Sequence, residues 1–305
     1  MKIVVMGCQQ IAIDFIKYLQ TLDDVEIPLI ITYELPLDKT YGYESVLEES
    51  GKLGINVKAP NTITKTLLDE IREIEPDMIF SIYYRKIFPQ SLIDIPKNGC
   101  VNIHPGKLPD YRGPVPTAWA IRNGESDFGI TIHYIDKGID TGDVLVQQNY
   151  SILEDETGFE LYTRAMELGG DLLKKNFYAI VNREIDPVKQ KGTGSYYGKM
   201  GGKYNIDWQL PREDIRNMIR VHAKPYNPAE SLLFNRYLLI NRASFYDKAD
   251  FIAQGPGRIV EVKDDEKLVV SCVDGCLLLE DYVIVPELDE TEKSVYLKTS
   301  NKLDW

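Results

Sequence analysis

Short apolar runs alternate with longer amphipathic stretches over the first 150 residues, and this alternation constrains the fold more than any other sequence feature. Four of the runs are typical of buried strands: Ile3–Met6, Val25–Thr32, Met78–Ile82 and Cys100–Ile103. The stretches between them predict helices over residues 10–21, 44–54 and 64–74. Strands separated by helices form βαβ units, so we expect an α/β fold with a mostly parallel sheet and helices on both faces.

The same alternation continues to about residue 182. It predicts a helix over residues 116–123 and strands over residues 129–135 and 144–151. A long helix is expected over Thr157–Asn182, because Glu160 stands at capping-box spacing from its first residue. These elements complete the first predicted domain.

A change of pattern near residue 200 predicts a second domain. Gly192–Tyr204 is rich in Gly, Lys and Tyr, as linkers often are, and Pro211 then opens a short helix. Short β-like runs separated by turn residues follow, over 237–240, 257–260, 268–270, 276–279 and 282–285. We therefore expect an α/β domain over residues 1–203 and a smaller, mostly β domain, a small barrel or sandwich, over residues 204–305.

The charge balance limits the partners. The chain has 305 residues, with 35 Lys and Arg against 47 Asp and Glu, a net charge of −12. Binding to a nucleic acid backbone depends on clustered Lys and Arg, so this composition argues against a nucleic-acid partner. Apolar runs stay short of 18 residues, so we expect no membrane-spanning helix.

The N-terminus and the cysteines predict a cytoplasmic protein. Met1–Gln10 has one Lys and a short apolar run, and it is typical of a first strand rather than a signal peptide. Cys8, Cys100, Cys272 and Cys276 are too few and too scattered for a disulfide framework, so we expect reduced thiols. Cys272 and Cys276 flank an Asp-Gly pair, which predicts a hairpin turn.

Several common motifs are missing from the sequence. The turn after the first strand, Gly7–Ala12, has one glycine where a dinucleotide-binding fingerprint needs three, so no dinucleotide cofactor is expected. The P-loop, G-x-S-x-G, H-E-x-x-H and C-x-x-C patterns are also missing. The three histidines, His104, His133 and His222, are too few and too far apart for a histidine-rich metal site, so we expect no metal.

The segment 101–145 carries the polar residues with the most chemical content. Asn102 and His104 stand two apart at the end of a predicted strand, so their side chains share one face. The carboxyl edge of a parallel sheet is where α/β enzymes bind ligands. Asp140 stands in a Gly-flanked loop between two predicted strands. An Asn, a His and an Asp that converge there could perform acid–base chemistry on an acyl group.

A structural interpretation of these residues fits the spacing as well. An Asn-x-His pair at a strand end is commonly turn chemistry around a hydrogen-bonded core histidine, and Asp140 is by default a turn residue. His133 alternates with apolar neighbours, so we expect it to be structural. Spacing by itself leaves catalysis and turn chemistry both open.

Three motifs in this segment resemble those of the folate-dependent formyltransferases, a family that includes glycinamide ribonucleotide, methionyl-tRNA and nucleotide-sugar formyltransferases. They are Asn102-Ile103-His104, Leu108-Pro109-Asp110-Tyr111-Arg112-Gly113 and Gly138-Ile139-Asp140-Thr141-Gly142-Asp143. A weaker resemblance covers Phe80–Arg85, which is similar to the family's pterin-pocket segment, and Ile206–Trp208, which is similar to the start of its C-terminal domain. The resemblance implies a Rossmann-like catalytic domain followed by a small open β-barrel.

The resemblance also implies the roles of the site residues. Asn102, His104 and Asp140 would be catalytic, and a substrate amine would attack the formyl carbon of N10-formyltetrahydrofolate. Protonated His104 and Asn102 would stabilise the oxyanion, while Asp140 would keep His104 charged and assist proton transfer. No metal is implied, since the donor is already an activated acyl carrier. The folate would contact five residues: Tyr84, Arg85, Ile87, Asp136 and Ile139.

Two acceptors remain open, methionyl-tRNA and an amino sugar carried on a nucleotide. Residues 205–305 hold 13 Lys and Arg against 18 Asp and Glu, a net of −5, which disfavours tRNA. The tRNA enzymes generally have a small residue and then Ser-Leu after the histidine, whereas Pro105-Gly106-Lys107 and Tyr83-Tyr84-Arg85 are more similar to the sugar enzymes. We expect a dTDP- or UDP-linked 4-amino-4,6-dideoxy sugar, for surface polysaccharide such as lipopolysaccharide O-antigen, with methionyl-tRNA as the alternative.

Four further residues are candidates for contacting the sugar nucleotide: Gln9, Gln10, Lys107 and Tyr197. Lys107 and the nearby Arg112 could meet a phosphate or could be solvated loop charges, and Tyr197 could cover the base or be a solvated linker residue. A hydrolase with the same folate chemistry and a non-catalytic binding protein are alternatives of another class. Apolar strands in the second domain would permit a homodimer.

Overall fold

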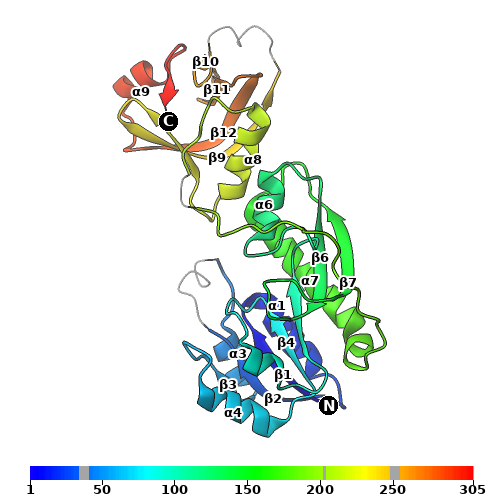
Figure 1. Cartoon of the computed structure of the whole chain (residues 1–305). Coiled ribbons are helices and arrows are strands. Elements are labelled where there is room, and N and C mark those ends of the chain that lie inside the picture. The colour runs from blue at the N-terminus through cyan, green and yellow to red at the C-terminus, as the bar shows by residue number, and fades with distance from the viewer. Residues whose placement is uncertain (34–40, 202–203, 248–254, 305) are drawn as a thin grey trace. The chain divides into compact units, whose positions relative to one another are not determined.

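The computed structural model describes residues 1–33, 41–201, 204–247 and 255–304, and the chain divides into two compact units (Figure 1). The first unit comprises Met1–Pro116, Asp127–Tyr150 and Thr163–Lys199. The second unit comprises Thr117–Ser126, Ser151–Tyr162 and Met200–Trp305.

The elements of the first unit alternate between strands and helices, as the sequence pattern predicts. They are β1 (Lys2–Gly7), α1 (Gln9–Leu19), β2 (Glu26–Ile31), α3 (Val46–Lys52), β3 (Val57–Lys58), α4 (Lys65–Ile74), β4 (Met78–Ile82), α5 (Gln90–Ile93), β5 (Cys100–His104), β6 (Asp127–Tyr134), β7 (Val144–Ser151) and most of α7 (Gly158–Val181). The remaining elements are α6 (Pro116–Arg122), α8 (Arg212–His222), β8 (Ala229–Leu233), β9 (Arg236–Tyr246), β10 (Ile259–Val262), β11 (Leu268–Ser271), β12 (Cys276–Val285), α9 (Glu290–Tyr296) and β13 (Leu303–Asp304).

The strands of the first unit form a seven-stranded, Rossmann-like sheet in the order β3-β2-β1-β4-β5-β6-β7. Strands β3, β2, β1, β4 and β5 are parallel, and β6 runs antiparallel to β5. The predicted mostly parallel α/β sheet is therefore confirmed. The antiparallel β6 matters for function, because it lies directly beside the strand that carries Asn102 and His104.

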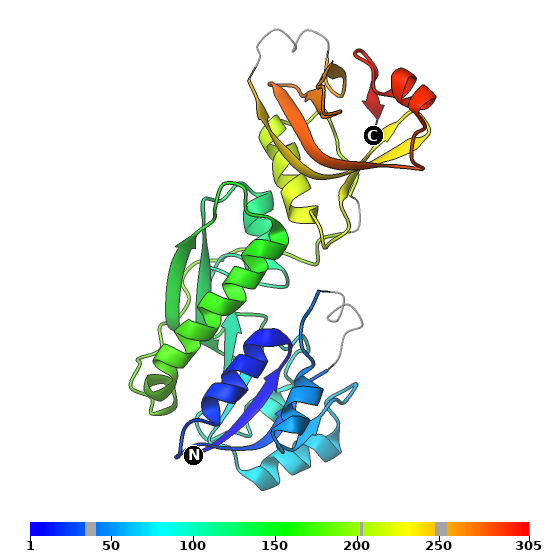
Figure 2. The same ribbon diagram turned by 180° about the vertical axis from the view of Figure 1, so that it is seen from behind.

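Helices cover both faces of this sheet because consecutive strand residues point to opposite sides. Ile79 of β4 packs in one buried cluster with Ile71 of α4. The next residue, Phe80, has its ring centroid 5.2 Å from that of Phe15 in α1 and 5.8 Å from that of Phe177 in α7. Figure 2 shows α1 and α7 in front of the sheet, on the face opposite α4.

The second unit holds a six-stranded antiparallel sheet in the order β10-β11-β12-β9-β8-β13, curled into a half-barrel. Ile215 and Ile219 of α8 pack into its core against Leu238. The indole Nε1 of Trp208 donates a hydrogen bond to Oγ of Ser231 at 2.9 Å, so this buried polar group is satisfied. The predicted β-rich, open-barrel-like fold is confirmed.

Local sequence signals are confirmed at two places and fail at another. Glu160 Oε2 accepts from the Thr157 N–H and Thr157 Oγ1 accepts from the Glu160 N–H, which is the predicted capping box. The hairpin between Cys272 and Cys276 is present. The two strands predicted over 276–279 and 282–285 are wrong: they are one strand, β12, with an irregular register at Asp281. The sequence pattern also misses β3, α5, β8, α9 and β13, because such short elements show little periodicity.

The histidine at the end of α8 should make the second unit less stable in acid. Burial, with a smaller effect from Arg122, lowers the pKa of His222 from 6.5 to about 4. Between these values the unfolded chain binds a proton that the folded unit does not, so the free energy of unfolding falls as the pH is lowered. The full effect is about 3 kcal/mol.

Urea denaturation of the wild type and of His222→Gln at pH 7.5 and at about pH 4.5 measures this dependence. Since glutamine does not titrate, the variant should lose less stability than the wild type on acidification. An equal loss in both proteins would contradict the prediction.

Candidate active site

The pairing of β5 with β6 sets Asn102 beside His133. The two are direct cross-strand partners, and Asn102 Nδ2 is 3.1 Å from His133 Nε2. His133 Nδ1 is 2.8 Å from the carbonyl oxygen of Tyr134, which can only accept, so Nδ1 carries the ring proton. In the neutral ring, Nε2 then accepts from Asn102. The second amide hydrogen of Asn102 has no partner among the described residues.

His104 is buried at the end of β5, and its two ring nitrogens face different groups. Nε2 lies 2.8 Å from the carbonyl oxygen of Tyr111 and must donate to it. Nδ1 lies 3.7 Å from Asp140 Oδ2, which is longer than a hydrogen bond. In the neutral ring Nδ1 therefore carries the lone pair and can accept a proton, and the nearby Asp140 carboxylate favours the protonated form.

The Asp140 carboxylate faces both His104 and His133. Its Oδ2 accepts a hydrogen bond of 2.9 Å from the Gly113 N–H, and its Oδ1 lies 3.6 Å from His133 Nε2. Its backbone has a φ of 53°, a left-handed conformation in which Asp and Asn are enriched. The loop between β6 and β7 therefore carries Asp140 back over β5 and β6, and the predicted catalytic residues lie in one cluster.

The surroundings lower the pKa values of both His104 and Asp140. Burial lowers the pKa of His104 below its usual value, although the Asp140 carboxylate and the Tyr111 carbonyl partly oppose this. Burial raises the pKa of Asp140, but His104, His133 and the Gly113 N–H outweigh it and hold that pKa well below its usual range. The resemblance implies a protonated His104, whereas its burial favours a neutral resting ring beside an ionised Asp140.

Sequence reasoning missed the place of His133. Its alternation with apolar neighbours predicts a structural residue, but the ring contacts both Asn102 and Asp140. The strand register is needed to find this residue, because only the antiparallel pairing of β6 with β5 sets position 133 opposite position 102.

Gly106 has no side chain, and this absence makes room for the His104 imidazole. A Cβ at this position would lie 2.4 Å from His104 Nε2 and 2.9 Å from the Tyr111 carbonyl oxygen, closer than atoms can approach. Gly106→Ala should therefore displace the imidazole and lower kcat of the implied acyl transfer by about 100-fold. Steady-state kinetics measure this.

The matched control for that variant is Gly51→Ala. Gly51 lies in α3 with open space around its Cβ position, so kcat should not change. Wild-type turnover in Gly106→Ala would show that the imidazole position tolerates displacement and would contradict the prediction.

The residues predicted to contact folate lie in two loops. Tyr84, Arg85 and Ile87 follow β4, which ends in register with Ile103 of β5. Ile87 is 71% exposed and Ile139, beside Asp140, is 43% exposed. A third large side chain, Tyr84, is buried against Tyr33, and its hydroxyl has no hydrogen-bond partner among the residues that the structure describes.

The fifth predicted folate residue, Asp136, is exposed and stabilises its own loop. Its Oδ1 accepts from the Gly138 N–H at 3.0 Å and from the Thr141 hydroxyl at 2.6 Å. These contacts hold the turn that precedes Asp140.

The residues predicted to contact the sugar nucleotide have internal partners. Gln9 is buried with a φ of 65°, and Gln10 donates from Nε2 to Asp14 within α1 at 2.8 Å. Lys107 Nζ lies 3.3 Å from Asp127 Oδ2, an exposed ion pair. Their roles in binding stay predictions.

Tyr197 lies against the loop that follows β5, and Arg112 is part of that loop. The Tyr197 ring stacks on Tyr111 with centroids 5.0 Å apart and planes 15° apart. Arg112 donates from Nε and Nη2 to Oε1 of Gln190, at 3.2 and 2.6 Å, and from Nη1 to the Thr193 carbonyl. The guanidinium is thus held within the protein, which contrasts with a solvated loop charge.

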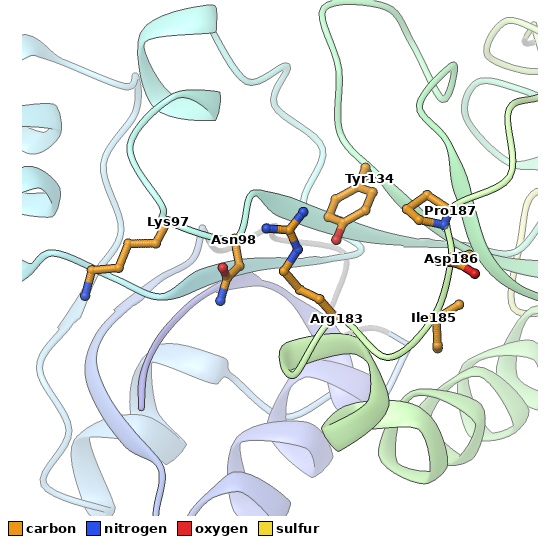
Figure 3. Close-up of a pocket in the computed structure, with 7 residues that line it drawn as sticks. All are labelled: Lys97, Asn98, Tyr134, Arg183, Ile185, Asp186 and Pro187. Atoms are coloured by element: carbon orange, nitrogen blue, oxygen red, sulfur yellow. The ribbon is translucent and has the colours of Figure 1, made fainter.

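A cavity of about 240 Å³ lies elsewhere in the first unit (Figure 3). It is bordered by Lys97 and Asn98, which precede β5, and by Arg183 and Asp186, which follow α7. Tyr134 lines it too, but side chains alternate along β6, so Tyr134 faces away from His133. The cavity is separate from the cluster of Asn102, His104, His133 and Asp140.

Over residues 1–33, 41–201, 204–247 and 255–304, no group of three or more His, Cys, Asp or Glu side chains is placed to hold a metal ion. Within the same ranges, no helix combines the length and apolar character that crossing a bilayer requires.

Comparisons with known proteins agree with the motifs in the site. The profile described as "Formyl transferase" matches residues 41–176, and "Formyl transferase, C-terminal domain" matches residues 202–284. Methionyl-tRNA formyltransferase of Clostridium tetani is 32% identical over 287 residues, which are 92% of this chain and 91% of the relative. The same enzyme of Alkaliphilus oremlandii is 32% identical over 280 residues, 89% of this chain and 88% of the relative.

Solved structures share the fold at lower identity. An N-formyltransferase from Helicobacter canadensis, solved with folinic acid and dTDP-3-aminofucose, has a TM-score of 0.75 at 23% identity and covers 92% of this chain and 99% of its own. WlaRD, a sugar 3N-formyl transferase, has a TM-score of 0.70 at 22% identity, with 94% and 99% covered. A 4-N formyltransferase from Francisella tularensis has a TM-score of 0.61 at 20% identity, with 92% and 98% covered. By its full-length relatives and the matched profiles, the chain belongs to the formyl transferase family.

Proposed function

We propose that this chain is an N-formyltransferase that moves a formyl group from N10-formyltetrahydrofolate to the amine of a dTDP- or UDP-linked 4-amino-4,6-dideoxy sugar. The observation that carries the formyl-transfer chemistry is the buried cluster in which His104 Nδ1 faces the ionised Asp140 and Asn102 keeps a free amide hydrogen. A base and an oxyanion donor are the two groups that acyl transfer to an amine requires.

His104 would act as the proton carrier. The folate donor supplies a formyl group already activated for attack by an amine. His104 Nδ1 would accept the proton that the amine loses on attack, and Asp140 would stabilise the resulting imidazolium. The same nitrogen would then return that proton to N10 as the C–N10 bond breaks, so His104 ends the cycle neutral.

Asn102 would stabilise the developing negative charge. Its second amide hydrogen can donate to the formyl oxygen, because the first is used by His133. A donor of this kind contributes roughly 3 kcal/mol to transition-state stabilisation. His133 would keep the Asn102 amide in the orientation that leaves this hydrogen available.

The exposed apolar residues beside the cluster would pack against a flat ring such as the pterin of the folate. Ile87 and Ile139 expose large apolar side chains in loops adjoining the site, and a pterin would cover such surface. This supports the assignment of the folate to the 84–87 and 136–139 segments. The buried Tyr84 hydroxyl without a partner is a further polar group in the same region.

The sugar nucleotide is favoured over tRNA by charge. Residues 205–305 carry a net charge of −5, and the whole chain −12. A tRNA backbone would be repelled, whereas a sugar diphosphate needs only one or two cations. Of the solved neighbours, WlaRD is a sugar 3N-formyl transferase and the Francisella tularensis protein is a 4-N formyltransferase, and for this chain we propose the 4-amino position.

Methionyl-tRNA is the second candidate acceptor. The full-length relatives at 32% identity carry that name, and their similarity extends over both parts of the chain. An enzyme of this kind would depend strongly on salt, because each phosphate contact releases a counterion.

An acceptor assay decides between them. The purified chain is incubated with N10-formyltetrahydrofolate and either dTDP- or UDP-linked 4-amino and 3-amino sugars or methionyl-tRNA, and products are identified by mass spectrometry. We expect formylated 4-amino sugar nucleotide, with a rate that changes little from 50 to 200 mM salt. Product only with methionyl-tRNA would overturn the sugar proposal, and tetrahydrofolate release without any acceptor would indicate a hydrolase.

A further inference from the structure

The side-chain amide of Gln190 joins the two loops that form the candidate active site. Its Nε2 donates to the main-chain oxygens of Asp140 and Gly142, both at 2.8 Å. Its Oε1 accepts from Nε and Nη2 of Arg112, at 3.2 and 2.6 Å. One amide thus satisfies two carbonyls of the Asp140 loop and two donors of the loop after β5.

Arg112 fixes the direction of this amide. A guanidinium only donates, so it selects the oxygen end of Gln190 and turns the NH2 end toward the two carbonyls. The third donor of Arg112, Nη1, reaches the Thr193 carbonyl at 3.2 Å, which orients the guanidinium itself. Gln190 therefore has one orientation in which all its polar atoms are used.

The residues on either side of Arg112 touch the reacting groups. The Tyr111 carbonyl accepts from His104 Nε2 at 2.8 Å, and the Gly113 N–H donates to Asp140 Oδ2 at 2.9 Å. The loop after β5 is also fixed to the segment around Ser195, whose Oγ accepts from the Tyr111 N–H. Gln190 binds this fixed loop on one side and the main chain of Asp140 on the other.

Asp140 needs such a support. Its backbone is left-handed, a conformation that is unfavourable for a residue other than glycine and persists only when neighbours hold it. Its carboxylate must stay within reach of His104 Nδ1, now at 3.7 Å, and of His133 Nε2, at 3.6 Å. A small shift of the loop would change both distances together.

We propose that Gln190, oriented by Arg112, is a positioning residue that holds the Asp140 carboxylate against His104 and His133. It acts through the main chain of the Asp140 loop and touches no reacting atom. The inference rests on the proposed formyl transfer for its kinetic test, but its structural content does not depend on the acceptor.

Two substitutions remove the bridge in different ways. Gln190→Met has similar length but loses all four hydrogen bonds. Gln190→Glu keeps the interaction with Arg112. It replaces the amide NH2 group with a carboxylate oxygen, which repels the carbonyl oxygens of Asp140 and Gly142. Both should lower kcat by about 100-fold with KM for the formyl donor within about threefold of wild type, because a misplaced carboxylate slows the chemical step.

The same substitutions at Gln148 are the matched controls. Gln148 is an exposed residue of β7, and both changes there should leave kcat as in the wild type. Wild-type kcat in both Gln190 variants, with folding verified by circular dichroism, would overturn the proposal.

A double substitution separates positioning from a general structural role. If Gln190 acts through Asp140, adding Gln190→Met to Asp140→Asn should reduce kcat by no more than about threefold further. A full additional 100-fold loss would mean that Gln190 acts elsewhere, and would overturn the proposal.

Histidine titration by NMR tests the geometry without any acceptor. The chain has three histidines, and the Asp140 charge raises the pKa of His104. Gln190→Met should let the carboxylate move away and so lower the His104 pKa, with the His222 titration unchanged. An unchanged His104 titration would overturn the proposal even if the enzyme proved to use a different acceptor, whereas failure of the acceptor assay alone would leave the NMR result standing.

Discussion

His104→Asn is expected to lower kcat by about 100- to 10,000-fold, the range that loss of a general base covers. Asparagine has no basic nitrogen, so nothing at this position can take the amine proton and return it to N10. The Nδ1 atom that faces Asp140 at 3.7 Å would be lost, while the carboxylate would stay. Single-turnover and steady-state measurements of tetrahydrofolate release give the loss directly.

His222→Gln is the control for this substitution. It removes the one histidine that lies outside the cluster, which packs against Tyr204 in the second unit. At pH 8, where His222 is neutral in any case, kcat of this variant should equal that of the wild type. If His104→Asn turned over at near-normal rate while its thermal unfolding stayed cooperative, the assignment of the base would be wrong.

Asp140→Asn is expected to lower kcat by at least about 100-fold with the fold retained. Asparagine adopts the left-handed backbone readily, and its Oδ1 can still accept from the Gly113 N–H. What disappears is the negative charge that stabilises protonated His104. Loss of that charge removes a contribution that raises the His104 pKa. The acid limb of the kcat profile should therefore move to lower pH.

Asp171→Asn provides the matched control for this change. Asp171 lies exposed on α7 and makes a weak ion pair with Lys174, so its loss should alter neither kcat nor the acid limb. An Asp140→Asn enzyme within fivefold of wild-type kcat, or an acid limb that moved to higher pH, would contradict the role given to the carboxylate.

The sequence predicts the first unit well because its signals are local. A run such as Met78–Ile82 is apolar except at Ser81, which is typical of a strand buried on both faces, and β4 has these same bounds. The capping residues Thr157 and Glu160 mark a helix start through contacts three residues apart. Local signals do not predict β12 as one strand. The sequence around Asp281, where the register of β12 is irregular, resembles a break between two strands.

The sequence predicts those residues of the candidate site that belong to a motif. Asn102 and His104 share a strand, so their common face follows from the period of two. Asp140 came from a resemblance, since a Gly-flanked Asp is by spacing only a turn residue. Neither His133 nor Gln190 has a local signal that distinguishes it from other buried or loop residues.

The sequence by itself determined the α/β class, the β-rich second part and the identity of the motif residues, because each depends on neighbours along the chain. The tertiary structure decided which groups meet. Antiparallel pairing set His133 opposite Asn102, and a segment 50 residues further on brought Gln190 to the Asp140 carbonyl. It also shifts the pKa values, since burial lowers the pKa of His104 while His104 and His133 outweigh burial at Asp140. Contacts and desolvation of this kind depend on atoms that are distant in sequence, and only the folded chain brings them together.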